Sequence, residues 1–292
     1  MGPVTDEHRV TYRENVKLAV AERKAVFDSA FMFDPNLSGE QARMVEIIAP
    51  QDARIDAAVG GPTPTFEAQH EPVWCLPRRI DQGKVIEVED QIKALTDFKS
   101  EYTQVIAQAM VRGKNSILVP ALFGTRLIGK QGATSSSAWA GSTVAVAVGG
   151  ADTSMNVAKL MRALRYFEEA EIILEEEEIF CALDAEENES LYNDIKFVNT
   201  DYRSKAVLEE KRVREILGVK IIPTQRIADT GADSTAAVWC KSGMYWGQFK
   251  ALAVNSAPNV DRQFREHVYA EQWIGAIRSE DKRVVKVLCK KA

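Results

Sequence analysis

The sequence predicts an α+β fold, because helical patterns lie in its middle and strand patterns fill its last third. The clearest helical pattern is apolar at steps of three and four from Ile92 to Met110, with charges on the other face. A second pattern runs from Val157 to Phe167. From residue 197 onward, short apolar segments separated by turn residues are typical of strands. This order favours α+β over repeating βαβ units.

The composition is that of a globular protein. The chain has 292 residues, of which 46% are hydrophobic and 27% charged, and this excludes general disorder. Its length suits about two ordinary domains, or one large domain with extensions. A net charge of −5 argues against a protein that coats nucleic acid with a basic surface. No apolar run reaches the ~20 residues that cross a bilayer, and the N-terminus lacks a signal-peptide layout. We therefore expect a soluble protein used in a reducing compartment.

The first 45 residues contain polar helical stretches rather than a core pattern. Val16, Val20 and Phe27 recur at roughly helical spacing, and Pro35 breaks the pattern. An N-terminal segment of this kind either packs on the body of the protein or extends to another molecule.

Two extended segments follow, and a turn-rich stretch joins them. Residues 44–50 and Phe66–Ile80 read as strands, and the glycines and prolines of 57–65 exclude regular structure between them. Pro72 and Pro77 mark the second segment as an edge, because a proline gives the ladder no donor. We expect a long, exposed, two-stranded loop that leans on a partner, since a lone hairpin is marginally stable.

Polar residues predict where the helices begin and end. Asp90 is a plausible N-cap for the first helix and Gly113 a plausible end, followed by a separate apolar segment, Ile117–Phe123. The second helix is expected to open at Asp152 or Thr153. A strand with an acidic lead follows.

Glu175–Glu178 form that acidic lead, and consecutive strand residues alternate faces, so we expect solvated charge there rather than a metal site. A third helix starts at Asp184.

One enzyme motif is present in part. Residues 124–130 fit the phosphate-binding pattern G-x-x-x-x-G-K, but Gln131 replaces the Ser or Thr that ligates Mg²⁺, and no helical period follows. A flexible loop is the better interpretation. No nucleophile elbow or metal spacing appears, and the four cysteines are too scattered for a metal or redox motif. The basic pairs Arg78–Arg79 and Lys290–Lys291 read as solvated charge.

The order and spacing of many weak features carry a resemblance. Between residues 90 and 132 these are an acidic helix start, Asp, Ser and Tyr about a turn apart, an alanine-rich end and a glycine loop: Asp90, Ile92, Leu95, Asp97, Ser100, Tyr102, Ala109, Met110, Arg112, Ile117, Ala121, Gly124, Gly129 and Gly132. Residues 155–172, 197–202 and Trp273–Ala276 add to them. Together they resemble the major capsid proteins of tailed bacteriophages, over about residues 40–292.

The resemblance implies the Hong Kong 97-type capsid fold. Its parts would be an N-terminal arm (1–43), an extended loop (44–88), a peripheral domain with a long spine helix (89–150), an axial domain (151–261) and strands that return to the peripheral domain (262–292). We expect no long scaffold-like segment before the arm, so that scaffolding, if used, would come from a separate protein or the short arm. The covalent cross-links of some members need Lys, Asn and an acid converging across subunits, and the sequence does not indicate them.

The function that the resemblance implies is assembly. A major capsid protein self-assembles as pentamers and hexamers into the icosahedral head shell around double-stranded DNA, in the host cytoplasm and then in the virion. We expect no catalytic residue, metal or cofactor and no membrane, with a scaffold, a portal and decoration or cement proteins as further partners and loose, non-specific DNA contact.

The expected assembly contacts lie in two regions. Loop 44–88 would cover a neighbouring subunit and the arm would reach beneath another, while the ADTGADS loop (228–234) would be an axial tip. The candidate residues are Phe66, Val73, Trp74, Arg78, Arg79, Thr230, Ala232 and Asp233.

Two alternatives stay open at this stage. An encapsulin-type compartment would use the same fold to enclose a cargo enzyme. An α+β nucleotide hydrolase would use the 124–131 loop and depend on Lys130.

Overall fold

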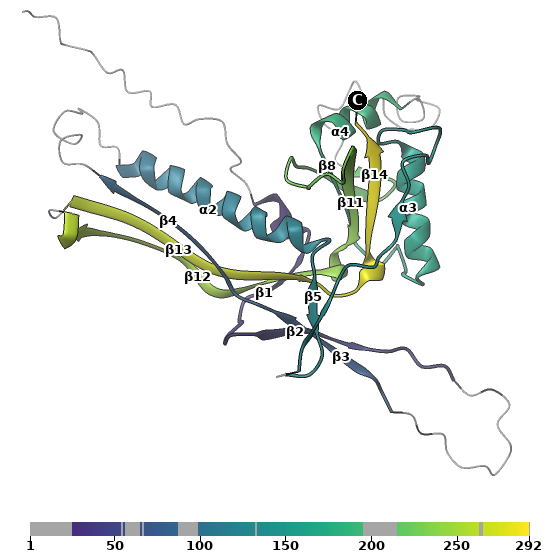
Figure 1. Cartoon of the computed structure of the whole chain (residues 1–292), viewed down its shortest axis with the longest axis horizontal. Coiled ribbons are helices and arrows are strands. Elements are labelled where there is room, and N and C mark those ends of the chain that lie inside the picture. Colours follow the sequence, from purple (N-terminus) through teal and green to yellow (C-terminus); the bar gives the residue numbers. More distant parts are fainter. Residues whose placement is uncertain are drawn as a thin grey trace, which may run out of the picture. The chain divides into compact units, whose positions relative to one another are not determined.

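A computed structural model describes residues 25–53, 55, 65, 67–86, 99–131, 133–194, 215–262 and 265–291 (Figure 1). Several sequence predictions lie outside these residues, namely the first helical stretch at Val16 and Val20, the Asp90 cap, the helix start from Ile92 to Phe98, Phe66, Gly132 and residues 197–202. None of the described helices is long and apolar enough to cross a membrane.

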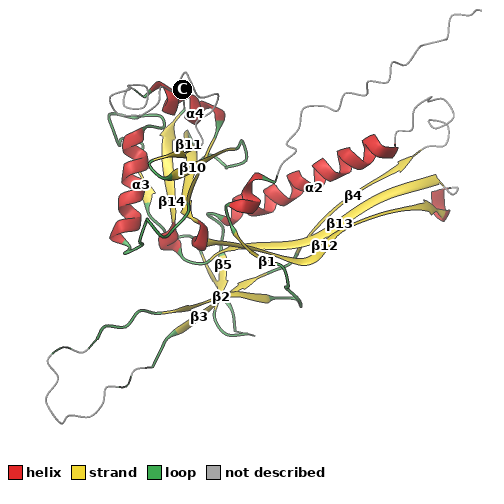
Figure 2. Ribbon diagram, turned by 180° about the vertical axis from the view of Figure 1, so that it is seen from behind, coloured by secondary structure: helices red, strands yellow, loops and turns green. Residues whose placement is uncertain are grey.

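The chain divides into two compact units. The larger comprises Val26–Arg78, Asn115–Phe249 and Ile274–Ala292, and the smaller contains Arg79–Lys114 and Lys250–Trp273. The domain boundaries inferred from the sequence stay predictions. Figure 2 shows the mixture of helices and strands, which is the α+β class that the sequence predicts.

The centre of the larger unit is a mixed six-stranded sheet in the order β7-β14-β11-β8-β10-β9. Antiparallel pairing joins β11 to β14 and to β8, and β8 runs parallel to β10. Its strands are β7 (Thr143–Val144), β8 (Ile179–Leu183), β9 (Glu215–Ile216), β10 (Val219–Pro223), β11 (Asp233–Cys240) and β14 (Val284–Lys290).

Both faces of this sheet are covered, so every residue of β8 is buried. On one face, helices α3 (Val157–Glu169) and α4 (Ala185–Asn193) add Leu160, Phe167 and Leu191 to the core. On the other, Trp239 stacks on Phe180. The segment before β1 packs there too.

The segment before β1 contains a short 3₁₀ turn (Val26–Ser29), and β1 itself is Met32–Asp34. Phe27 and Phe31 are buried against Trp239, whose indole N–H donates to the carbonyl of Ala30 at 3.0 Å. The described part of the N-terminal lead therefore packs on the body of the protein, which is one of the two outcomes that the sequence allowed.

Helix caps agree with the sequence at one helix and differ at another. Asp184 caps α4 as predicted, in a capping box with Glu187. The cap of α3 is Asn156, whose side chain accepts from the N–H of Lys159, so the predicted start at Asp152 or Thr153 is wrong. Thr153 instead bonds to the preceding loop, through the carbonyls of Val146 and Val148.

Helix α2 (Lys99–Ala121) runs past Gly113 and absorbs most of the apolar segment predicted after it. Gly113 does not end the helix. A Cβ at this position would lie 2.6 Å from Cγ2 of Ile80 on β4 (Arg78–Ile86), so glycine permits a close approach. Ile106 and Met110 of the same helix pack against Ile80, Val268 and Ala270.

A second sheet has the order β2-β3-β5-β6 and contains β2 (Ala42–Ile48), β3 (His70–Cys75), β5 (Arg126–Ile128) and β6 (Ser135–Ser137). The extended segments do pair, with Ile48 opposite His70. However, β3 is an inner strand, so its predicted edge position is wrong. Pro72 is tolerated because it lies beyond the β3–β5 ladder, where its carbonyl accepts from the N–H of Gly129 at 3.2 Å.

The third sheet has the order β1-β12-β13-β4, with the long strands β12 (Met244–Asn259) and β13 (Arg265–Arg278) at its centre. Short 3₁₀ turns join β11 to β12 (Lys241–Gly243) and β13 to β14 (Asp281–Arg283).

Candidate assembly surfaces

The base of the predicted extended loop carries exposed apolar side chains. Ile48 and Ile55 are 58% and 82% exposed. Beside Ile48, Glu46 accepts from His70 at 2.9 Å and pairs with Arg43 at 3.0 Å. Strand alternation alone does not single out these isoleucines, because it does not say which face of a hairpin lacks a neighbour. They are surface that another molecule can cover.

The apolar residues predicted as contacts lie inside the chain. Val73 is fully buried beside Ile277, and Trp74 is buried with its Nε1 donating to the carbonyl of Gly129 at 2.6 Å. In the single chain they hold the base of the loop together. Phe66 lies outside the described residues.

One member of each basic pair is bonded within the chain. Arg79 donates to the Tyr269 hydroxyl at 2.6 Å, which together with nearby carboxylates raises the pKa of Arg79. Lys291 pairs with Asp229 at 2.6 Å, which raises the pKa of Lys291. Arg78 is exposed. Neither pair interleaves with aromatic residues as in a nucleic-acid stacking platform.

The three predicted tip residues form one tight turn before β11. The N–H of Thr230 donates to the carbonyl of Asp233 at 3.0 Å and the N–H of Asp233 donates back at 3.2 Å. Gly231 has φ +66°, as the first central position of a type II′ turn requires. Thr230 and Ala232 are exposed and Asp233 is half-buried, so the turn offers its tip to solvent.

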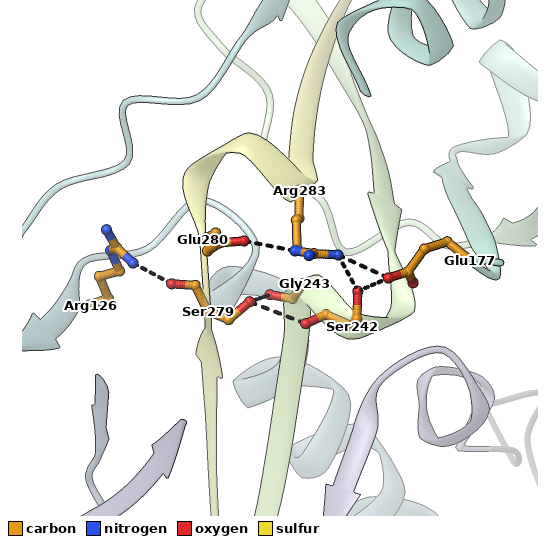
Figure 3. Close-up of polar contacts among 7 residues, drawn as sticks. All are labelled: Arg126, Glu177, Ser242, Gly243, Ser279, Glu280 and Arg283. Atoms are coloured by element: carbon orange, nitrogen blue, oxygen red, sulfur yellow. Dashed lines mark hydrogen bonds and ion pairs between the residues drawn. The ribbon is translucent and has the colours of Figure 1, made fainter. Parts of the chain in front are cut away.

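A polar network joins the two 3₁₀ turns that connect the six-stranded sheet to the long strands β12 and β13 (Figure 3). Arg283 donates to Glu177 at 2.9 Å, to Glu280 at 2.7 Å and to Ser242 at 2.7 Å. Burial alone would lower the pKa of Arg283, but the bond to Glu280 and both carboxylate charges raise it. A Cβ on Gly243 would lie 2.6 Å from Cβ of Arg283, so the turns touch. The network holds together the two turns that connect β11 to β12 and β13 to β14.

The phosphate-loop motif has the wrong context for nucleotide binding. It follows a helix and contains β5, so it is neither a loop from strand to helix nor the flexible loop that the sequence suggested. The buried guanidinium of Arg278 donates to the carbonyls of Leu122 and Gly124 at 2.8 and 2.9 Å, and burial lowers the pKa of Arg278. The N–H of Gly129 donates to the carbonyl of Pro72. The motif is part of the sheet β2-β3-β5-β6.

Two buried charged side chains, Lys159 and Glu187, bond helices α3 and α4 to strands of the six-stranded sheet. The ammonium of Lys159 donates to the carbonyls of Thr153 and Leu288 at 2.5 and 2.8 Å, and burial lowers its pKa. Glu187 accepts from the Ser234 hydroxyl at 2.6 Å, and burial raises its pKa. The arrangement ties α3 and α4 to β14 and β11.

The acidic stretch before β8 is not wholly solvated. Glu178 pairs with Lys220 and Lys241, both at 2.7 Å, and these bonds lower its pKa to about 2. Glu177 belongs to the Arg283 network. No group of three or more His, Cys, Asp or Glu among the described residues is placed to hold a metal ion. The four cysteines are buried free thiols, and burial raises the pKa of Cys75, Cys240 and Cys289 to about 12.

The solved structures to which this chain is similar include capsids of phages and of a GTA particle. The capsid of cyanophage P-SCSP1u matches with a TM-score of 0.72 and 13% identity over 98% of this chain and 94% of its own. The capsid of a native GTA particle matches with a TM-score of 0.72 and 10% identity over 99% and 98%. The mature capsid of bacteriophage PhiM1 matches with a TM-score of 0.65 and 14% identity over 96% and 91%. The fold is thus the phage capsid fold, as the sequence resemblance implied.

The family model described as "Phage capsid protein" matches residues 4–291, and the chain belongs to this family. Its function is to build the major capsid shell of a phage particle. No curated protein matches the chain in sequence.

Proposed function

We propose that this chain is the major capsid protein of a tailed phage and closes, as five- and six-membered rings, into an icosahedral head around double-stranded DNA. The observation that carries the proposal is the match to the phage capsid family along nearly the whole chain, residues 4–291. The chain has a net charge of −5, which suits loose, non-specific contact with DNA during packaging and ejection. Assembly takes place in the host cytoplasm, with a scaffold, a portal and decoration proteins as separate partners.

The extended loop supplies the contact to a neighbouring subunit. Strand β2 is at the edge of its sheet, and Ile48 and Ile55 are exposed beside it. An edge strand can pair with another chain through its backbone while apolar side chains anchor the contact. Arg78 and the 230–233 turn offer further exposed surface, whereas Val73 and Trp74 support the loop from within. Each contact can be weak, because a closed shell contains many copies of the contact that act together.

The test is size-exclusion chromatography with negative-stain microscopy of the full chain and of a variant without residues 54–64. Wild type is expected to form closed shells or rings, and the deletion a soluble subunit that forms neither. A matched control replaces 54–64 by a Gly/Ser segment of equal length, which keeps the reach of the loop and removes Ile55. Normal shells from the deletion would refute the role of the loop.

The contents of particles purified from infected cells distinguish a shell around a genome from a shell around a cargo enzyme. Nuclease-protected double-stranded DNA inside them is the expected result. A co-purified enzyme in place of DNA would favour the encapsulin-type alternative.

A further inference from the structure

Arg126 lies inside the G-x-x-x-x-G-K motif and contacts two separate parts of the fold. Its Nη2 lies 3.2 Å from Oε1 of Glu71 on β3, and its Nη1 donates to the carbonyl of Ser279, directly after β13. The side chain of Arg126 is only 12% exposed, so little water competes for these contacts. Arg126 therefore bridges the extended loop and the turn that leads into β14.

Ser279 is itself held firmly in place. Its N–H donates to the carbonyl of Gly243 at 2.9 Å, and its hydroxyl donates to the carbonyls of Ser242 and Gly243 at 3.2 and 3.1 Å. Because Arg283 donates to the Ser242 hydroxyl, these bonds join Ser279 to the polar network that Figure 3 shows together with Arg126. The carbonyl that Arg126 uses is thus a fixed point.

The extended loop is joined to β5 by a short ladder. Its paired residues are Val73 with Ile128 and Trp74 with Leu127. Glu71 lies outside this ladder, two residues nearer to the far end of the loop. The ion pair of Glu71 therefore acts on a part of the loop that the ladder does not hold.

The length of the loop amplifies any rotation at its base. Residues 49–69 lie between the last residue of β2 and the first residue of β3. Ten extended residues span up to ~33 Å, so a rotation of about 10° at the base would displace a point at that distance by ~6 Å. A displacement of this size exceeds the ~4–4.5 Å within which apolar side chains touch.

An arginine suits such a bridge, because its terminal nitrogens bond two acceptors at once in a fixed plane, whereas a lysine carries its charge on a single nitrogen. We propose that Arg126 is a positioning residue for capsid assembly, which holds the extended loop through Glu71 in the direction that a neighbouring subunit can bind. The inference rests on the proposed function, since it needs the loop to make the contact between subunits. It gives the motif a role in assembly rather than in phosphate binding.

The test compares two variants that break the bridge with two controls, all in the full chain. Arg126→Lys keeps the charge and removes the second bonding nitrogen, and Glu71→Gln keeps the size and removes the charge. Lys130→Gln is the control within the motif, at an exposed position. Asp184→Ala is the control for stability, because it weakens the fold at the capping box of α4.

The first measurement is the direction of the loop in the unassembled subunit. Spin labels at two exposed positions, Gln69→Cys in the loop and Glu168→Cys on α3, give the distribution of distances between them by electron paramagnetic resonance. The four native thiols are buried, so they do not compete for the label. We expect Arg126→Lys and Glu71→Gln to shift or broaden this distribution, and both controls to leave it as in the wild type.

The second measurement is the concentration at which shells form, followed by light scattering and negative-stain microscopy. We expect each bridge variant to raise it about fivefold, because the apparent affinity falls with the fraction of subunits whose loop has the right direction. The double variant should be no worse than either single variant, since both remove the same bridge. Both controls should assemble at the wild-type concentration.

Two results would overturn the inference and leave the proposed function intact. One is a distribution of distances in the bridge variants that equals that of the wild type. The other is a bridge variant that assembles as well as Asp184→Ala at an equal loss of stability, which would make the role of Arg126 merely structural. Failure of the wild type itself to form shells or rings would overturn the proposed function, and the role of Arg126 in assembly with it.

Discussion

Two phenylalanines separated by one residue should differ widely in what they contribute to stability. Phe31 is 1% exposed and meets the ring of Phe27 at 6.1 Å and that of Trp239 at 5.9 Å. Its replacement by alanine leaves a cavity beside Trp239, and we expect the free energy of unfolding to fall by about 3–5 kcal/mol. Phe33 is 48% exposed and has one ring partner, Trp246, at 4.2 Å. Water fills the space that it leaves, so Phe33→Ala should cost only about 1–2 kcal/mol.

Guanidinium unfolding followed by tryptophan fluorescence measures both variants, because Trp239 reports on the site directly. The two losses should differ by about 1–4 kcal/mol at unchanged denaturant slope, with Phe31→Ala the larger. A loss below about 1 kcal/mol for Phe31→Ala, or equal losses for both, would mean that residues 26–34 are not part of the folded core.

Three further changes test the packing, the capping and the electrostatics. Gly275→Ala would place a Cβ 2.3 Å from Sγ of Cys75, and thermal unfolding should show a loss of about 1–3 kcal/mol from overpacking; an unchanged midpoint would contradict the close approach. Asp184→Ala removes half of a capping box, so far-UV dichroism on denaturant titration should show a loss of about 0.5–2 kcal/mol, which Asp184→Asn should largely spare. The ion pairs that lower the pKa of Glu178 to about 2 stabilise the fold fully above about pH 4.5, and this contribution is lost as pH falls toward 2. Because that side chain is 46% exposed, the effect should stay below about 1 kcal/mol, and Glu178→Gln should show no such loss over this range.

Local sequence signals predicted which helices and strands form better than they predicted which elements pack beside one another. Gly113 reads as a helix end, because glycine is common there, yet the same residue also permits a close approach such as the one to Ile80. Nothing within four residues of Gly113 distinguishes the two uses. Pro72 shows the same limit, because a proline only excludes a donor at its own position and does not exclude an inner strand.

The assembly surfaces were predicted as regions rather than as residues. The loop around 44–88 was found from its prolines and glycines, but the exposed side chains on it are Ile48 and Ile55, whereas Val73 and Trp74 are buried. Alternation along a strand predicts two faces. Which face is covered depends on Tyr245, Phe249 and Ile277, which pack in one cluster with Val73 and Cys75 and lie far along the chain from them.

The sequence by itself determined the α+β class, the periods of α2 and α3, the capping box at Asp184 and the order of weak features that marks the capsid family. These depend on residues within a few positions of each other or on their order along the chain. The tertiary structure decided that residues 26–34 pack on the six-stranded sheet at Trp239, over 200 residues away in sequence. It also decided which glutamates of 168–178 are paired. Those outcomes depend on contacts between distant segments, and no local pattern encodes the partner.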